Sequence, residues 1–178
     1  MALVTLDEVK EALESPPVDD ALLANLIDRA SRVVERYTGR VFLHTNLTER
    51  HDGGSATLYL LRRPVVRVVS VTDTENGIAV PEEHYVIDPG AGMLIRRMGK
   101  WEPGVRRWEV SYVAGYGATT AEVPGDVKQA VIQLVTAWYN RRDPGVTSEH
   151  IGDYSRNVEA GLPQQVRELL APYVEVVI

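Results

Sequence analysis

The sequence predicts an α+β fold: a small helical bundle around a long central helix, with an inserted antiparallel β-sheet. Apolar residues recur at the three-and-four spacing of a helix face in residues 20–38 and 124–142. Between them, from about residue 41 to residue 116, short runs rich in β-branched and aromatic residues are separated by turns containing glycine and proline. With 178 residues, 44% of them hydrophobic, the chain is long enough to bury a core.

The segment Val123–Asp143 is predicted to be the central helix. Val131, Leu134 and Trp138 share one face, and further apolar residues widen that face to most of the circumference. We therefore expect these three side chains in the core, covered on more than one side. Pro144 follows the segment and ends the helix.

Capping signals place the other helices. Thr5 and Glu8 have the spacing of a capping box, and Asp19 or Asp20 can cap the next helix, which Gly39 ends. Helices are expected near residues 6–14, 20–38, 124–142 and 163–171.

The middle of the chain changes to the two-residue period of strands. Trp108, Val110 and Tyr112 alternate with polar residues, as one buried and one solvated face require. Strands are expected at residues 57–61, 65–72, 84–88, 93–97 and 107–113. The predicted organisation is a single domain over 1–178, with helices in 1–40 and 117–172, a β insert at 41–116 and a C-terminal arm at 173–178.

Two segments do not fit the predicted core. Residues 143–161 have no sustained periodicity, and a connection of this length is long for a compact domain. The arm from Tyr173 is apolar and short. We expect both segments to serve docking.

Composition and motifs argue against several functions. The net charge of −6 disfavours a general nucleic-acid binder, and no apolar run is long enough to cross a bilayer. No cysteine is present, the four histidines lack helical pairing, and the glycine-rich stretches have the wrong spacing for nucleotide loops. The N-terminus has acids where a signal peptide has bases. We therefore predict no catalytic residues, no cofactor and no metal.

Arginine doublets are the most distinctive polar feature: residues 62–63, 96–97, 106–107 and 141–142. One interpretation is ordinary solvated strand edges and a helix end; the other is bidentate pairing with carboxylates of another subunit. In residues 1–40 five basic residues face eight acidic ones, a net of −3, which could supply such carboxylates. The hypothesised interface residues are Arg62, Arg96, Arg106, Ile151, Tyr154, Tyr173, Val176 and Ile178.

The layout resembles the head–tail connector (adaptor) proteins of tailed bacteriophages. The similarity rests on VVERYTGR, RRPVVRVVSV, IGDYS and LPQQVRELLAPY, and above all on VSYVAGYG leading into VPGDVKQAVIQLVTAWYNRRD. It covers nearly the whole chain, and its motifs concern packing and turns, which indicates a structural role.

The resemblance implies a virion protein of the head–tail junction, present in the host cytoplasm during assembly. It implies a ring, a dodecamer in our first interpretation, that contacts the portal on one side and a stopper or tail-completion protein on the other. DNA would pass through without specific binding, and no membrane would be involved. Two alternatives stay open here: a small-ligand enzyme of unknown reaction, and another neck protein such as a stopper.

Overall fold

The computed structural model describes residues 1–13, 19–140 and 162–174. The chain divides into two compact units. Met1–Thr38 and Val123–Ile178 form the helical unit, and Gly39–Glu122 form the β unit. The predicted arrangement as a single domain with an arm stays a prediction.

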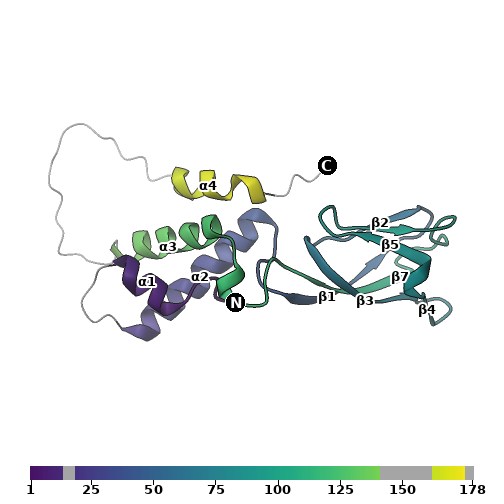
Figure 1. Cartoon of the computed structure of the whole chain (residues 1–178), viewed down its shortest axis with the longest axis horizontal. Coiled ribbons are helices and arrows are strands. Elements are labelled where there is room, and N and C mark those ends of the chain that lie inside the picture. Colours follow the sequence, from purple (N-terminus) through teal and green to yellow (C-terminus); the bar gives the residue numbers. More distant parts are fainter. Residues whose placement is uncertain (14–18, 141–161, 175–178) are drawn as a thin grey trace. The chain divides into compact units, whose positions relative to one another are not determined.

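The helical unit contains four helices in the described part of the chain. They are α1 (Leu6–Leu13), α2 (Asp20–Thr38), α3 (Gly125–Asn140) and α4 (Gln164–Leu170), followed by a 3-10 turn at Ala171–Tyr173. Each lies where the sequence predicted a helix. Helix α3 contacts the other three helices (Figure 1).

Local hydrogen bonds explain where the helices begin. The Thr5 N–H donates to Glu8 Oε2 (2.7 Å) and the Glu8 N–H donates to Thr5 Oγ1 (3.2 Å), which confirms the capping box. The Ala21 N–H donates to Asp19 Oδ1 (2.9 Å), so Asp19 caps α2. Gly39, which follows α2, has φ 74°, a conformation that costs glycine little.

The core of the helical unit confirms two of the three residues predicted for α3. Val131 and Leu134 are fully buried. Trp138 is only half-buried, which corrects the prediction. It lies in the last turn of α3, and the Arg29 guanidinium of α2 covers its ring at 4.8 Å from the centroid.

The β unit contains seven strands. They are β1 (Thr45–His51), β2 (Thr57–Tyr59), β3 (Val65–Asp73), β4 (Ile78–Ala79), β5 (Tyr85–Asp88), β6 (Met93–Arg96) and β7 (Trp108–Ala114). They form two antiparallel sheets, one in the order β1-β7-β3-β4 and one in the order β2-β6-β5 (Figure 1).

The two sheets share one hydrophobic cluster. Trp108, Val110 and Tyr112 of β7 are buried in the alternation predicted from the sequence, and Leu58 and Leu94 of the smaller sheet belong to the same cluster. Each sheet therefore buries one of its faces against a face of the other sheet.

The predicted fold class is wrong in its architecture. No long central helix organises a bundle: α3 has 16 residues and is shorter than α2, which has 19. Two antiparallel sheets replace the single inserted sheet, so an α+β class holds only loosely. Strand β1 was not predicted because TNLTERH carries only one large apolar residue, Leu47. As an edge strand, β1 alternates between exposed and half-buried residues.

Candidate protein-interaction site

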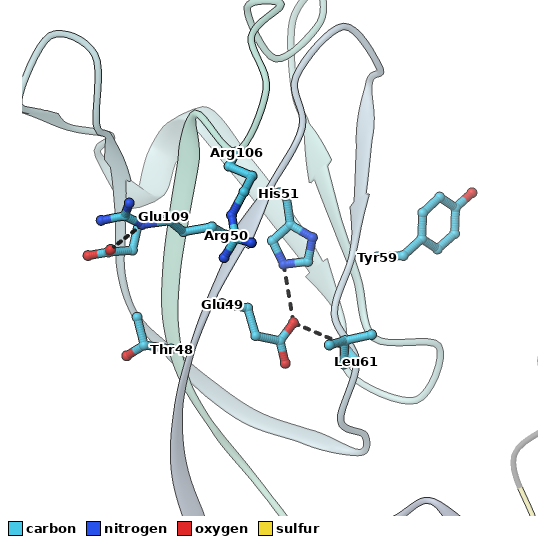
Figure 2. Close-up of a pocket in the computed structure, with 8 residues that line it drawn as sticks. All are labelled: Thr48, Glu49, Arg50, His51, Tyr59, Leu61, Arg106 and Glu109. Atoms are coloured by element: carbon cyan, nitrogen blue, oxygen red, sulfur yellow. Dashed lines mark hydrogen bonds and ion pairs between the residues drawn. The ribbon is translucent and has the colours of Figure 1, made fainter.

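An open pocket of about 620 Å³ lies along the edge of β1 (Figure 2). Four consecutive residues of β1 line it. Because neighbouring residues of a strand point to opposite faces, a pocket lined by four in a row follows the strand edge and not one face of the sheet. Among the described strands β1 pairs only with β7, so its other edge has no partner strand in this part of the chain. The lining residues are Thr48, Glu49, Arg50, His51, Tyr59, Leu61, Arg106 and Glu109.

A partly buried network under the pocket centres on Glu49. Its Oε2 accepts a hydrogen bond from the Leu61 N–H at 3.0 Å and lies 3.2 Å from His51 Nε2 (Figure 2). Its Oε1 accepts the Tyr112 O–H, whose oxygen in turn accepts the Arg62 N–H at 3.0 Å. The network ties the segment after β2 to the two strands β1 and β7.

Electrostatics favour an ionised Glu49 carboxyl and a protonated Tyr112 hydroxyl. Burial opposes ionisation of Glu49, but hydrogen bonds from His51, Tyr112 and the Leu61 N–H outweigh it and lower the pKa of its carboxyl. Burial, with the hydrogen bond to Glu49, raises the pKa of the Tyr112 hydroxyl well above its ordinary value. At neutral pH the Tyr112 hydroxyl therefore remains a hydrogen-bond donor and the Glu49 carboxylate an acceptor. This gives the network a structural role.

The rim of the pocket combines paired charges with exposed apolar groups. Arg50 lies directly opposite Glu109 on β7, and the two form an ion pair at 2.9 Å. Tyr59 and Leu61 expose 62% and 68% of their surface. Exposed apolar groups bordered by satisfied polar groups are typical of a protein contact.

A second polar pair, Asp73 and Arg107, was not predicted. Arg107 donates to both carboxylate oxygens of Asp73, from Nε at 2.9 Å and from Nη2 at 2.7 Å. Arg107 lowers the pKa of the Asp73 carboxyl far below its ordinary value. The sequence offers one signal for it: Asp73 ends a strand before the Thr-Glu-Asn-Gly turn, where an aspartate can accept a hydrogen bond from the turn backbone.

The predicted interface arginines have three different environments. Arg62 is half-buried, and its guanidinium donates to the Gly39 carbonyl. Arg96 is half-buried over a tryptophan ring. Arg106 is exposed, with φ 52°, and lines the pocket beside β1.

Of the apolar residues predicted for the interface, only one lies among the described residues. Tyr173 is half-buried in the turn after α4. Ile151, Tyr154, Val176 and Ile178 lie outside the described residues. The structure brings only Arg106 to the pocket, and the interface role of the whole set stays a prediction.

Within residues 1–13, 19–140 and 162–174, no group of three or more histidine or acidic side chains could hold a metal ion. In the same ranges, no helix is both long and apolar enough to span a membrane.

Comparison with known proteins identifies the class. By its family and its shared fold, the chain is a structural protein of the phage head–tail junction. The chain belongs to the head completion protein family, whose sequence profile matches residues 2–176. Comparison with curated proteins gave no match.

Solved structures share the fold. A chain of the virion of a native gene transfer agent (GTA) particle superimposes with a TM-score of 0.72 at 20% identity, covering 99% of this chain and 91% of that one. A chain from the neck of the empty GTA particle, computed with C6 symmetry, gives 0.71 at 20% identity with the same coverage. One from the neck of the native particle, computed with C12 symmetry, gives 0.68 at 21% identity, covering 97% and 89%.

The family settles the main alternative left open by the sequence. The prediction of a structural head–tail connector subunit is confirmed, and the small-ligand enzyme is excluded because the family is structural.

Proposed function

We propose that the chain forms a closed ring of twelve subunits between the portal and the tail-side neck protein. The observation that carries this proposal is the family match over residues 2–176, together with a shared fold in a GTA neck that was computed with C12 symmetry. Portal protein would contact one side of the ring, and a stopper or tail-completion protein the other.

The free edge of β1 supports a contact between subunits. An unpaired strand edge offers backbone donors and acceptors to another chain, and Tyr59 and Leu61 add apolar area beside it. A ring requires a head-to-tail interface, in which this patch meets a different patch of the next subunit. Arg106 at the rim of the same pocket supplies a charge that can fix register.

DNA passes through such a ring on its way to the tail. The net charge of −6 suits a conduit that does not hold its cargo, because tight DNA binding comes from basic groups that neutralise phosphates. We therefore propose no specific DNA site in the β unit or the helical unit.

The test is assembly on purified portal from the same virus. Native mass spectrometry of portal mixed with this chain should show added mass of about twelve times the 19.8 kDa subunit. Leu61→Asp should reduce this assembly because it places a charge at the apolar rim. Val86→Asp, at an exposed apolar residue of β5, is the matched control. If the chain stays a monomer beside portal at all concentrations, the ring proposal is wrong.

A further inference from the structure

A second hollow of the β unit, of about 360 Å³, lies where β6 ends. Its lining residues are Glu83, His84, Arg96, Arg97 and Met98. Arg96 is the last residue of β6 and pairs with Tyr85 of β5, and the Arg97 N–H donates to the His84 carbonyl at 3.0 Å. The backbone around the hollow is therefore fixed, while Met98 at its rim is 86% exposed.

In the described part of the chain, the Arg96 guanidinium at this hollow forms no ion pair. Its Cζ lies 5.0 Å from the centroid of the fully buried Trp101 ring. Its Nη1 and the Trp101 Nε1 are both buried without a hydrogen-bond acceptor in the described part of the chain. Buried polar groups are almost always hydrogen-bonded, and a buried charge normally has a partner, so this pair of donors requires an explanation.

The same unit contains the completed version of this arrangement. Arg107 stacks on Trp108 at 5.6 Å, and the Asp73 carboxylate accepts both of its hydrogen bonds. Arg96 stacks on Trp101 in the same way. Within residues 1–13, 19–140 and 162–174, however, no carboxylate forms an ion pair with it. By analogy with Arg107, a carboxylate would complete the arrangement at Arg96, because it matches a guanidinium in a planar, bidentate manner.

We propose that the hollow beside Arg96 receives a carboxylate from a second copy of this chain; the inference rests on the proposed ring. Acidic residues outnumber basic ones by six in the sequence, and α1 exposes Asp7 and Glu11 one helical turn apart. A head-to-tail ring brings such a segment of one subunit onto a different surface of the next. A DNA phosphate is the less favoured ligand, because the similar Arg107 pairs with a carboxylate and the net charge of −6 disfavours binding of a polyanion.

The first variant is Arg96→Met, which keeps an unbranched stem over Trp101 and removes the charge. Because it also removes a half-buried charge that has no ion-pair partner among the described residues, the melting temperature of the isolated subunit should stay equal or rise. Assembly on portal should weaken about tenfold to a hundredfold, the range for one charge-assisted hydrogen bond. Arg67→Met, at an exposed arginine of β3, is the control and should leave both unchanged. A lower melting temperature with unchanged assembly would mean that Arg96 only covers Trp101, and would overturn the proposal.

The second variant is Met98→Glu, which brings a carboxylate to the rim of the hollow from the same chain. At an exposed position it should leave folding intact, and it should weaken assembly by repelling or replacing the incoming carboxylate. Assembly equal to wild type for both Arg96→Met and Met98→Glu would overturn the proposal and leave the ring itself standing. A wild-type chain that does not assemble on portal would overturn both.

Duplex DNA provides the remaining test. Fluorescence anisotropy with a labelled duplex should give the same weak affinity for wild type and Arg96→Met. If Arg96→Met instead loses DNA affinity and assembles normally, the hollow binds phosphate and the carboxylate proposal is wrong.

Discussion

At the scale of single residues, the β unit depends on partly buried side chains, such as Glu49, that accept hydrogen bonds from several elements at once. Glu49 connects His51 of its own strand with Tyr112 of β7 and with the Leu61 N–H of the segment after β2. Such a network stabilises one arrangement only while every member is paired. The hydrogen-bond donors to Glu49 and the charge of Glu49 can each be tested by substitution.

The first prediction for this network concerns the Tyr112 hydroxyl. Tyr112→Phe removes one donor to Glu49 and leaves the Arg62 N–H without its acceptor, so we expect a loss of about 1–3 kcal/mol in the free energy of unfolding. Urea denaturation measures it. Tyr59→Phe removes a hydroxyl from an exposed tyrosine of the same pocket and should change stability by less than about 0.5 kcal/mol. Equal effects of the two substitutions would contradict the network.

The second prediction concerns how the stability contributed by Glu49 depends on pH. The folded-state pKa of Glu49 is lowered from 4.5, so the unfolded chain binds protons more readily there. Its contribution to stability is therefore present above about pH 4.5 and is lost as the pH falls through the folded-state pKa. Glu49→Gln should show a smaller decline of stability with acid than wild type, when both are measured by denaturation between neutral and acidic pH. A decline as steep as that of wild type would assign the acid sensitivity to other carboxyls.

At the scale of elements, helix periodicity was readable because a helix presents one continuous face. The spacing of Val127, Val131 and Leu134 and the capping box at Thr5 and Glu8 each depend on residues within a few positions of one another. Strand β1 was not readable, since its pairing with β7 joins Thr45 to Ala114, and nothing local marks that partner. The division into two sheets depends on the same long-range pairing.

The prediction at this scale is Leu134→Ala. The side chain is 1% exposed within a helix that contacts α1, α2 and α4, so the substitution should cost about 2–5 kcal/mol through lost burial and the cavity left behind. Gln129→Ala, on the exposed side of α3, is the control and should change the free energy of unfolding by less than about 0.5 kcal/mol. A small effect at Leu134 would refute its assignment to the core.

At the scale of the whole molecule, the sequence was more informative about the class of protein than about the residues of its interaction surface. Motifs such as VSYVAGYG carried the family resemblance over most of the chain. The candidate site was less readable. Of the eight predicted interface residues, Arg106 alone lines the pocket beside β1, and Arg96 lines the second hollow. The others of that pocket, such as Glu49 and Leu61, come together through sheet pairing and through hydrogen bonds between segments distant in sequence.

The C-terminal arm remains a docking prediction. Truncation after Pro172 should leave a folded, soluble protein, because the buried residues Val166 and Leu170 of α4 are retained. Binding to portal should be lost, as measured by co-sedimentation, with circular dichroism as the check on folding. An unfolded truncation product would show that the arm is part of the core.

The last prediction concerns the charge of the ring interface. Exposed ion pairs contribute about 0–1 kcal/mol each, so charge can set register in a ring but cannot hold it together. We would reverse Arg62, Arg96 and Arg106 one at a time to Glu and measure assembly on portal at low and high salt. Arg106→Glu is the cleanest of the three because its side chain is exposed; Arg62 and Arg96 are half-buried, so their reversal must be read beside the melting temperature. We expect weaker assembly at low salt for Arg106→Glu and a smaller difference from wild type at high salt, because ions screen exposed charges. Assembly that responds neither to the substitutions nor to salt would refute charge complementarity while leaving the connector assignment intact.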